Sequence, residues 1–157
     1  MCFIHRNGWI FSAIALCVLI GGLGSCDSVT GIVEDLRPIT VELVNTTDFP
    51  IEPFLYTDDD DSTFWTSNIT KNENRVATGE IPPHTTEVFT FSCERAGTMM
   101  TDHAEMYTGC CVVESDNAPI IREKDDFDCY DVISFVFVDT GAEFYTEVEV
   151  NGYLVRD

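Results

Sequence analysis

The sequence predicts an all-β domain, folded as an antiparallel β-sandwich of seven to nine short strands. Two observations support this prediction. Apolar and polar side chains alternate in most segments from residue 39 onward, which is the period-two pattern of half-buried strands. Turn signals such as Asn151-Gly152 separate these segments, and no segment has the 3.6-residue period of a convincing amphipathic helix.

The strands are expected where the alternation occurs, beginning with Ile39, Val41 and Leu43. The most continuously apolar run, residues 131–138, predicts a central strand that is covered on both faces. Short strands separated by turn signals indicate a sandwich that is immunoglobulin-like in its general architecture. The expected strands are residues 39–45, 51–56, 64–68, 86–94, 98–107, 111–114, 119–123, 130–138 and 142–150.

The first 25 residues have the three zones of a secretory signal peptide. Residues 1–8 carry Arg6 and no acidic residue, residues 9–20 are almost wholly apolar, and small residues follow them. A retained membrane-spanning helix is the alternative, but a simple one needs about 20 apolar residues, and this run is shorter and ends in glycines. We therefore expect residues 1–25 to be removed on export.

The four residues Leu23-Gly24-Ser25-Cys26 resemble the lipobox of bacterial lipoproteins. The resemblance implies that the thiol of Cys26 is alkylated with a diacylglyceryl group and that Cys26 becomes the first mature residue. It implies an exported protein, held by lipid on the bacterial cell membrane or outer membrane, with its domain in the periplasm or at the cell surface. Two or more acyl chains give stable anchoring. An ordinary signal peptide with a chance cysteine is the alternative.

The mature chain is expected to contain a tether and one domain. Residues 26–38 carry the lipidated N-terminus and end in Pro38, and residues 39–157 form a single acidic domain. The mature part holds all 28 acidic residues and seven of the eight basic ones, so its net charge is −21. Nucleic acid and an anionic bilayer surface would repel such a chain. The remaining expected partners are the membrane, through the lipid, and an unidentified protein or glycan.

Four cysteines remain in the mature chain once Cys26 carries lipid: Cys93, Cys110, Cys111 and Cys129. An exported protein meets an oxidising compartment, so disulfides are expected, and four cysteines allow three connectivities. We prefer Cys93–Cys129, because Cys93 ends one expected strand and Cys129 begins the most apolar one. If these two strands are antiparallel neighbours, the end of one lies beside the start of the other. The adjacent pair would then form a strained vicinal disulfide, stay reduced, or link to another chain. The rival scheme joins Cys93 and Cys129 each to one member of that pair.

An acidic run suggests a calcium site as a second hypothesis. Asp58, Asp60 and Ser62 have the spacing of the first three ligands of an EF-type loop, although the later positions of such a loop do not match. A second acidic cluster, which includes Asp125 and Asp126, could meet the first across the fold. The alternative is that both are solvated acidic turns, and no other cofactor is indicated.

Catalytic signals are weak. The mature chain has only two histidines, His84 and His103, and it lacks the common hydrolase, metalloprotease, phosphate-binding and dinucleotide-binding motifs. Phe54 with Tyr56 suggests either an aromatic binding face or core packing. We therefore expect a non-catalytic protein with a role in binding, adhesion or envelope structure. The alternatives are a small hydrolase that uses acidic residues and an accessory subunit of an envelope transport or secretion complex.

Overall fold

The structure is a computed structural model that describes residues 38–59 and 69–156. This part of the chain contains nine strands and two short 3₁₀ helices. No helix among these residues is long and apolar enough to cross a membrane. The strands are β1 (Pro38–Asn45), β2 (Ile51–Asp58), β3 (Thr86–Ser92), β4 (Thr98–Tyr107), β5 (Val112–Glu114), β6 (Ile120–Arg122), β7 (Val132–Asp139), β8 (Phe144–Val150) and β9 (Tyr153–Arg156), and the helices are η1 (Asn72–Asn74) and η2 (Cys93–Arg95).

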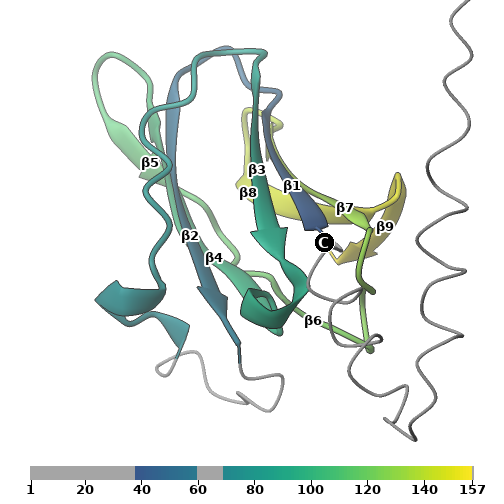
Figure 1. Cartoon of the computed structure of the whole chain (residues 1–157). Coiled ribbons are helices and arrows are strands. Elements are labelled where there is room, and N and C mark those ends of the chain that lie inside the picture. Colours follow the sequence, from purple (N-terminus) through teal and green to yellow (C-terminus); the bar gives the residue numbers. More distant parts are fainter. Residues whose placement is uncertain (1–37, 60–68, 157) are drawn as a thin grey trace, which may run out of the picture. The chain divides into compact units, whose positions relative to one another are not determined.

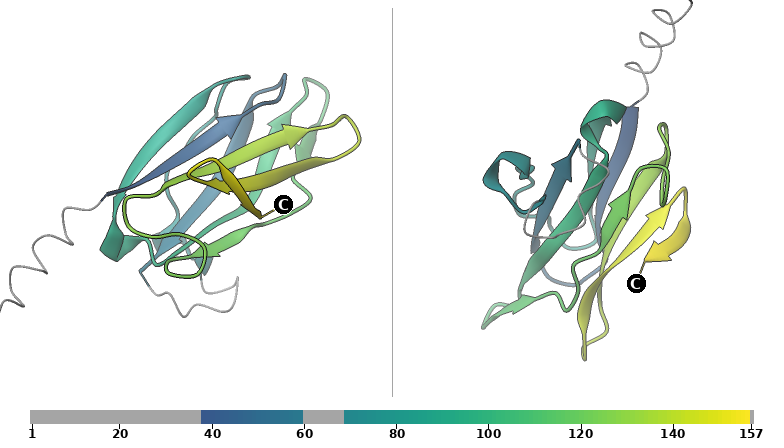
Figure 2. Two further views of the ribbon diagram at one scale, coloured as in Figure 1. Left: turned by 90° about the vertical axis from the view of Figure 1, so that its right-hand side faces the viewer. Right: turned by 90° about the horizontal axis from the view of Figure 1, so that it is seen from below.

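The strands form two sheets that pack face to face as a β-sandwich (Figures 1 and 2). The larger sheet has the order β3-β1-β7-β8-β9, and the smaller has the order β2-β4-β5, with β6 also paired to β4. The predicted fold class is therefore confirmed. Eight expected segments coincide with strands β1 to β8, whereas the ninth, residues 64–68, lies outside the described residues.

The pairing of β1 with β7 is parallel, although the sequence suggested antiparallel sheets. Leu43 of β1 lies beside Phe135 of β7, and the two strands run in the same direction at the centre of the larger sheet. All other strand pairs are antiparallel among the described residues. Alternation of side chains reports which face is buried and carries no information on strand direction, so this pairing could not be predicted from it.

Residues from both sheets meet in one apolar core. Ile133, Phe135 and Phe137 of β7 are fully buried in that core. On the opposite face of β7, Ser134 is buried but Val132 and Val136 are only half-buried, so the prediction of a strand covered on both faces holds only in part. β7 is nevertheless the central strand of its sheet, as expected. The core also contains Ile39, Val41 and Leu43 of β1, Ile51 and Leu55 of β2, Met99, Ala104 and Met106 of β4, and Val148 of β8.

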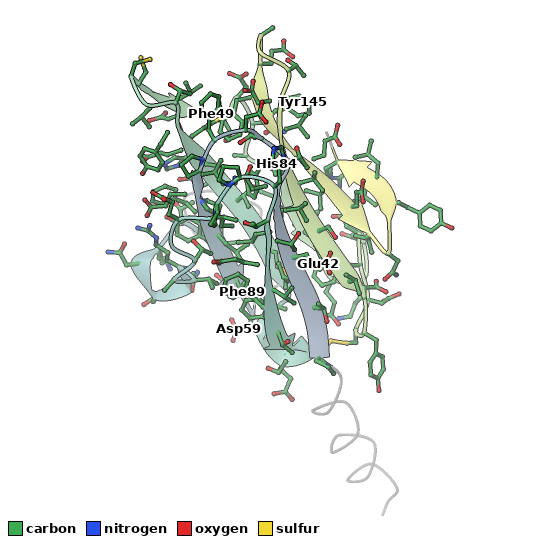
Figure 3. All side chains as sticks on the ribbon, turned by 90° about the horizontal axis from the view of Figure 1, so that it is seen from above. Glu42, Phe49, Asp59, His84, Phe89 and Tyr145 are labelled. Atoms are coloured by element: carbon green, nitrogen blue, oxygen red, sulfur yellow. A yellow bond between two sulfur atoms is a disulfide. The ribbon has the colours of Figure 1, made fainter. Side chains whose placement is uncertain are left out.

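The strand directions define two ends of the sandwich. We call them the Pro38 end, where β1 begins, and the Asn45 end, where β1 ends. Because β3 is antiparallel to β1 and β7 is parallel to it, β3 finishes and β7 starts at the Pro38 end. Figure 3 shows Phe49, His84 and Tyr145 toward the Asn45 end and Asp59 toward the other.

A later segment of the chain covers the edge of β2 that does not pair with β4. Val76 donates its backbone N–H to Leu55, and Ile81 and Ile51 exchange backbone hydrogen bonds. Pro53, which cannot donate to a neighbouring strand, is tolerated because β2 is the edge strand of its sheet. The ladder to β4 shifts register between Pro53 and Leu55. The covering segment protects the edge from pairing with other chains and places Arg75 beside β2.

Asn45 organises the Asn45 end through four hydrogen bonds of its buried side chain. Its Nδ2 donates to the carbonyls of Phe49, Ile81 and Pro82 at 2.8, 3.1 and 3.1 Å. Its Oδ1 accepts the backbone N–H of Thr47 at 2.9 Å. The amide thereby holds the β1–β2 connection against the loop that precedes β3. Only 1% of Asn45 is exposed, so its side-chain amide finds its hydrogen-bond partners within the protein rather than in water.

Replacing Asn45 by aspartate is expected to destabilise the domain more than replacing it by alanine. A carboxylate would face three carbonyl oxygens in a buried site, which costs at least about 2 kcal/mol. Urea unfolding at neutral pH tests this order. Asn45→Asp should regain part of its stability on acidification, because a protonated carboxyl can donate one hydrogen bond, whereas Asn45→Ala should show no such recovery. Equal stability of the two variants at neutral pH would contradict this role.

Candidate functional site

Two glutamates lie directly opposite each other on the solvent face of the smaller sheet. Glu52 of β2 pairs with Glu105 of β4 in the antiparallel ladder, and both are half-buried. Like charges in this position normally repel. Tyr107 moderates the repulsion, because its hydroxyl lies 2.9 Å from Oε2 of Glu105 and 3.0 Å from Oε2 of Glu52. The hydroxyl of Tyr107 therefore donates its one proton to both carboxylates.

Phe54 of β2 and His103 of β4 continue this surface along the same strands, and Arg75 of the segment that covers β2 lies beside them. The ring of Phe54 stacks on that of His103 with centroids 4.2 Å apart and planes inclined by 19°. The guanidinium carbon of Arg75 lies 4.2 Å from the centroid of Phe54, and its Nη2 lies 3.8 Å from Oε1 of Glu52. We call this surface the β2–β4 face. It consists of Glu52, Phe54, Arg75, His103, Glu105 and Tyr107.

A surface hollow of ≈ 430 Å³ adjoins the β2–β4 face. Its lining includes Glu52 and Arg75, and most of the residues that line it are exposed. Small molecules usually bind in an enclosed cavity. An open hollow beside a sheet is better matched to contact with the surface of a larger partner. The full lining is Glu52, Asn72, Arg75, Ala77, Thr78 and Gly79.

The two hydrogen bonds to Glu105 and Glu52 raise the pKa of Tyr107 well above its ordinary value near 10. An ionised phenolate would face both carboxylates, so the folded protein retains this proton more tightly than the unfolded chain does. The contribution to stability is therefore complete below about pH 10 and is lost as the pH rises above that value.

The wild-type protein should consequently lose stability faster than Tyr107→Phe as the pH rises from about 9 to about 11. Phenylalanine has no proton to release, and titration of the other tyrosines contributes equally to both proteins. Urea midpoints of both proteins at the two pH values measure the difference. Identical pH dependence in the two proteins would show that the hydroxyl does not lie between the carboxylates.

A second acidic surface lies beside β8. A hollow of ≈ 770 Å³ there is lined by Asp116, Asn117, Ala142, Glu143, Tyr145 and Glu147. The hydroxyl of Tyr145 donates to Oε1 of Glu147 at 3.4 Å, which is long for a hydrogen bond of this kind. Asp116, Ala142 and Glu143 are exposed. The side chains of the β2–β4 face are held more firmly by one another, so we take that face as the candidate site and the β8 hollow as its comparison.

Cys93 and Cys129 are joined by a disulfide with a Cα–Cα distance of 5.6 Å, as predicted. The expectation that the strands beside these cysteines are neighbours was wrong, because β1 lies between β3 and β7. Both cysteines lie just beyond these strands at the Pro38 end, where β1 begins. Oε1 of Glu123 lies 3.5 and 3.6 Å from the two sulfurs. These three residues have the proximity of a metal site, but the disulfide consumes both thiolates.

Cys110 and Cys111 are free and exposed in the turn between β4 and β5. The rival scheme, in which each pairs with Cys93 or Cys129, is therefore wrong. That turn joins the end of β4 to β5 at the Asn45 end, whereas the disulfide lies at the Pro38 end, so the two pairs are separated by the length of the strands.

The calcium hypothesis is only partly covered by the described residues, because Asp60 and Ser62 lie outside them, as does Cys26. Oδ2 of Asp58 accepts a hydrogen bond from Asn74 at 2.9 Å. Both carboxylate oxygens of Asp126 are engaged, one by Arg156 at 2.7 Å and the other by the backbone N–H of Arg122 at 3.0 Å. Asp125 is exposed. The described residues bring together one cluster of three or more ligand-type side chains, and it contains none of these aspartates.

The two histidines lie apart. His84 is exposed beside Asp48, with Nε2 3.0 Å from its Oδ1, whereas His103 belongs to the β2–β4 face, with Nδ1 3.4 Å from Asp102. Of the proposed aromatic pair, Phe54 lies on that face and Tyr56 packs in a small cluster with Ile69 and Met100.

Sequence reasoning missed Glu52, Tyr107 and Arg75. The spacing of His103, Glu105 and Tyr107, two residues apart, could have placed these three on one face of their strand. Their partners on β2 follow only from the register of the ladder. Arg75 lies in a segment without periodicity, and the sequence carries no signal for its position. In comparisons with known proteins, no family model and no curated protein matches the chain.

Proposed function

We propose that this protein is a lipid-anchored, non-catalytic binding module of the bacterial cell envelope, and that the β2–β4 face binds a partner with a basic surface. The observation that carries the proposal is the pair Glu52 and Glu105, which share the single proton of Tyr107. Together these residues fix excess negative charge on a structured surface. Complementary charge of this kind steers encounters and selects partners.

The lipid on Cys26 explains how so acidic a domain stays on a membrane. Its net charge of −21 opposes adsorption to anionic headgroups. Acyl chains contribute about 0.8 kcal/mol for each buried CH₂ group, so two chains outweigh this repulsion. β1 begins at Pro38, which leaves an 11-residue tether, residues 27–37, after Cys26. When extended, such a tether reaches about 40 Å, enough to present the domain clear of the headgroups.

Two variants that lose equal negative charge on different surfaces distinguish binding by the β2–β4 face from binding caused by the net charge of the whole domain. The double variant Glu52→Gln/Glu105→Gln and the matched control Glu143→Gln/Glu147→Gln lose the same charge on different surfaces. Binding to an immobilised ten-lysine peptide is measured for both. We expect at least a tenfold loss of affinity for the first variant and less than a twofold loss for the control. Equal losses would mean that net charge alone causes binding, which would contradict a specific site.

Site-specific crosslinking in the native host identifies the class of partner. A photoreactive amino acid replaces the exposed Asn72, which lines the hollow beside the face, or the exposed Thr90 on β3 as the control. A discrete protein adduct from position 72 alone supports a protein partner, including the larger complex of which an accessory subunit would be part. A glycan adduct from that position supports envelope adhesion. Adducts of equal yield from both positions, or from neither, would count against this face.

The same glutamates are the observation that favours a hydrolase as the second candidate. Two neighbouring carboxylates are the minimal machinery for glycoside hydrolysis. Here, however, both accept a hydrogen bond from one phenol, and the adjoining hollow is open to solvent. Release of soluble fragments from purified host cell wall by the wild type, lost in Glu52→Gln or in Glu105→Gln alone, would favour the enzyme over the binding module.

A further inference from the structure

The turn between β4 and β5 holds two adjacent thiols in a defined conformation. Cys110 and Cys111 are both exposed at its tip. The backbone N–H and the hydroxyl of Thr108 both donate to the carbonyl of Cys111, at 3.0 and 3.1 Å. Gly109 has φ +82°, a conformation that glycine adopts without strain. The turn is therefore closed by its own hydrogen bonds.

The two sulfurs within this turn are in contact and are chemically different. Their Sγ atoms lie 3.2 Å apart, with the thiol of Cys111 oriented to donate to Cys110. The hydroxyl of Thr108 lies 3.7 Å from Sγ of Cys110. The thiol of Cys111, and then this hydroxyl, lower the pKa of Cys110, while the same contact raises the pKa of Cys111. Cys110 is thus the better thiolate, and Cys111 is a thiol within reach of it.

The two cysteine pairs of the domain differ in what a disulfide would cost. Unstrained disulfides join Cα atoms about 4.4–6.8 Å apart. Cys93 and Cys129 meet this requirement at 5.6 Å, and at the Pro38 end Cys93 is buried and Cys129 half-buried. Consecutive residues have Cα atoms only about 3.8 Å apart. A bond between Cys110 and Cys111 would therefore be strained and exposed, and disulfides with these properties are the readily reduced ones.

We propose that Cys110 and Cys111 form a thiol–disulfide exchange site that reacts reversibly with low-molecular-weight disulfides. The thiolate of Cys110 attacks one sulfur of such a disulfide, forms a mixed disulfide and releases one thiolate. Sγ of Cys111 then attacks Sγ of Cys110, which releases the second thiol and closes the vicinal disulfide. The protein loses two protons and two electrons, and the small disulfide takes them up to become two thiols. This site is independent of the binding function proposed above.

Reaction of the purified full-length protein with glutathione disulfide at neutral pH tests the site. Peptide mass mapping should find Cys110 and Cys111 in one monomeric chain, two hydrogens lighter and without attached glutathione. Cys111→Ser should accumulate one glutathione on residue 110, since no resolving thiol remains. Cys110→Ser should react at least fivefold more slowly, because the better nucleophile is absent. On titration with dithiothreitol, the vicinal bond should open before Cys93–Cys129.

The wild-type mapping needs no variant, so the test does not depend on the folding of either mutant. Stable glutathione on Cys110 or Cys111 of the wild-type protein, a dimer linked through residue 110 or 111, or no reaction at these two residues would overturn the proposal. Simultaneous reduction of both disulfides would also overturn it, because the two pairs would then not differ in stability.

Discussion

Replacing Cys93 and Cys129 together by alanine is expected to lower the free energy of unfolding by about 3–4 kcal/mol. The disulfide closes a loop of 36 residues, and its loss gives the unfolded chain more conformational freedom. It also ties the end of β3 to the start of β7 across the first residue of β1. Because folded domains are stable by only about 5–15 kcal/mol, this loss is a large fraction of the total.

Urea unfolding of the oxidised wild type and the double variant measures this change. The control is Cys110→Ala/Cys111→Ala, which makes the same chemical change in an exposed turn and should cost less than about 0.5 kcal/mol. A similar loss in both double variants would contradict the structural role of the Cys93–Cys129 disulfide.

Phe135→Ala is expected to be the most destabilising single substitution, with a loss of about 3–5 kcal/mol. Phe135 is fully buried in β7, the central strand of the larger sheet, and it lies beside Leu43 of β1. Truncation removes the transfer free energy of the ring and leaves a cavity between the two sheets, which can collapse only in part because both sheets are fixed by their ladders.

Val136→Ala is the matched control, because Val136 is the next residue of the same strand and lies half-buried on the opposite face. It should cost less than about 1.5 kcal/mol. Chemical unfolding of both variants, followed by circular dichroism, gives the comparison. If the two losses were equal, the core would not lie on the side of β7 that faces the smaller sheet.

Much of the fold could be predicted because the alternation of apolar and polar residues in the sequence indicates which residues of a strand are buried. β8 is an example, since Phe144, Thr146, Val148 and Val150 are all buried and the residues between them are half-buried. Strand β9 was not predicted from the sequence. The turn at Asn151-Gly152 was visible, but the four residues that follow it are mostly exposed and show no buried alternate face. Strand direction could not be predicted either, as the parallel pair of β1 and β7 shows.

The candidate site was less predictable than the fold, because it depends on register. His103 was recognised from its residue type, but its contact with Phe54 depends on the register that pairs Pro53 of β2 with Ala104 of β4. The Cys93–Cys129 disulfide was predicted correctly for a partly wrong reason. The two cysteines do lie at the same end of the sheet, but they meet past the start of an intervening strand.

The most direct test is the intact mass of the protein extracted from membranes of its native host, together with the mass of its N-terminal peptide. We expect a chain that begins at Cys26 and carries a diacylglyceryl thioether, with Cys93 and Cys129 two hydrogens lighter than in the reduced form. An unmodified Cys26, or an N-terminus at another residue, would contradict a lipid-anchored envelope protein.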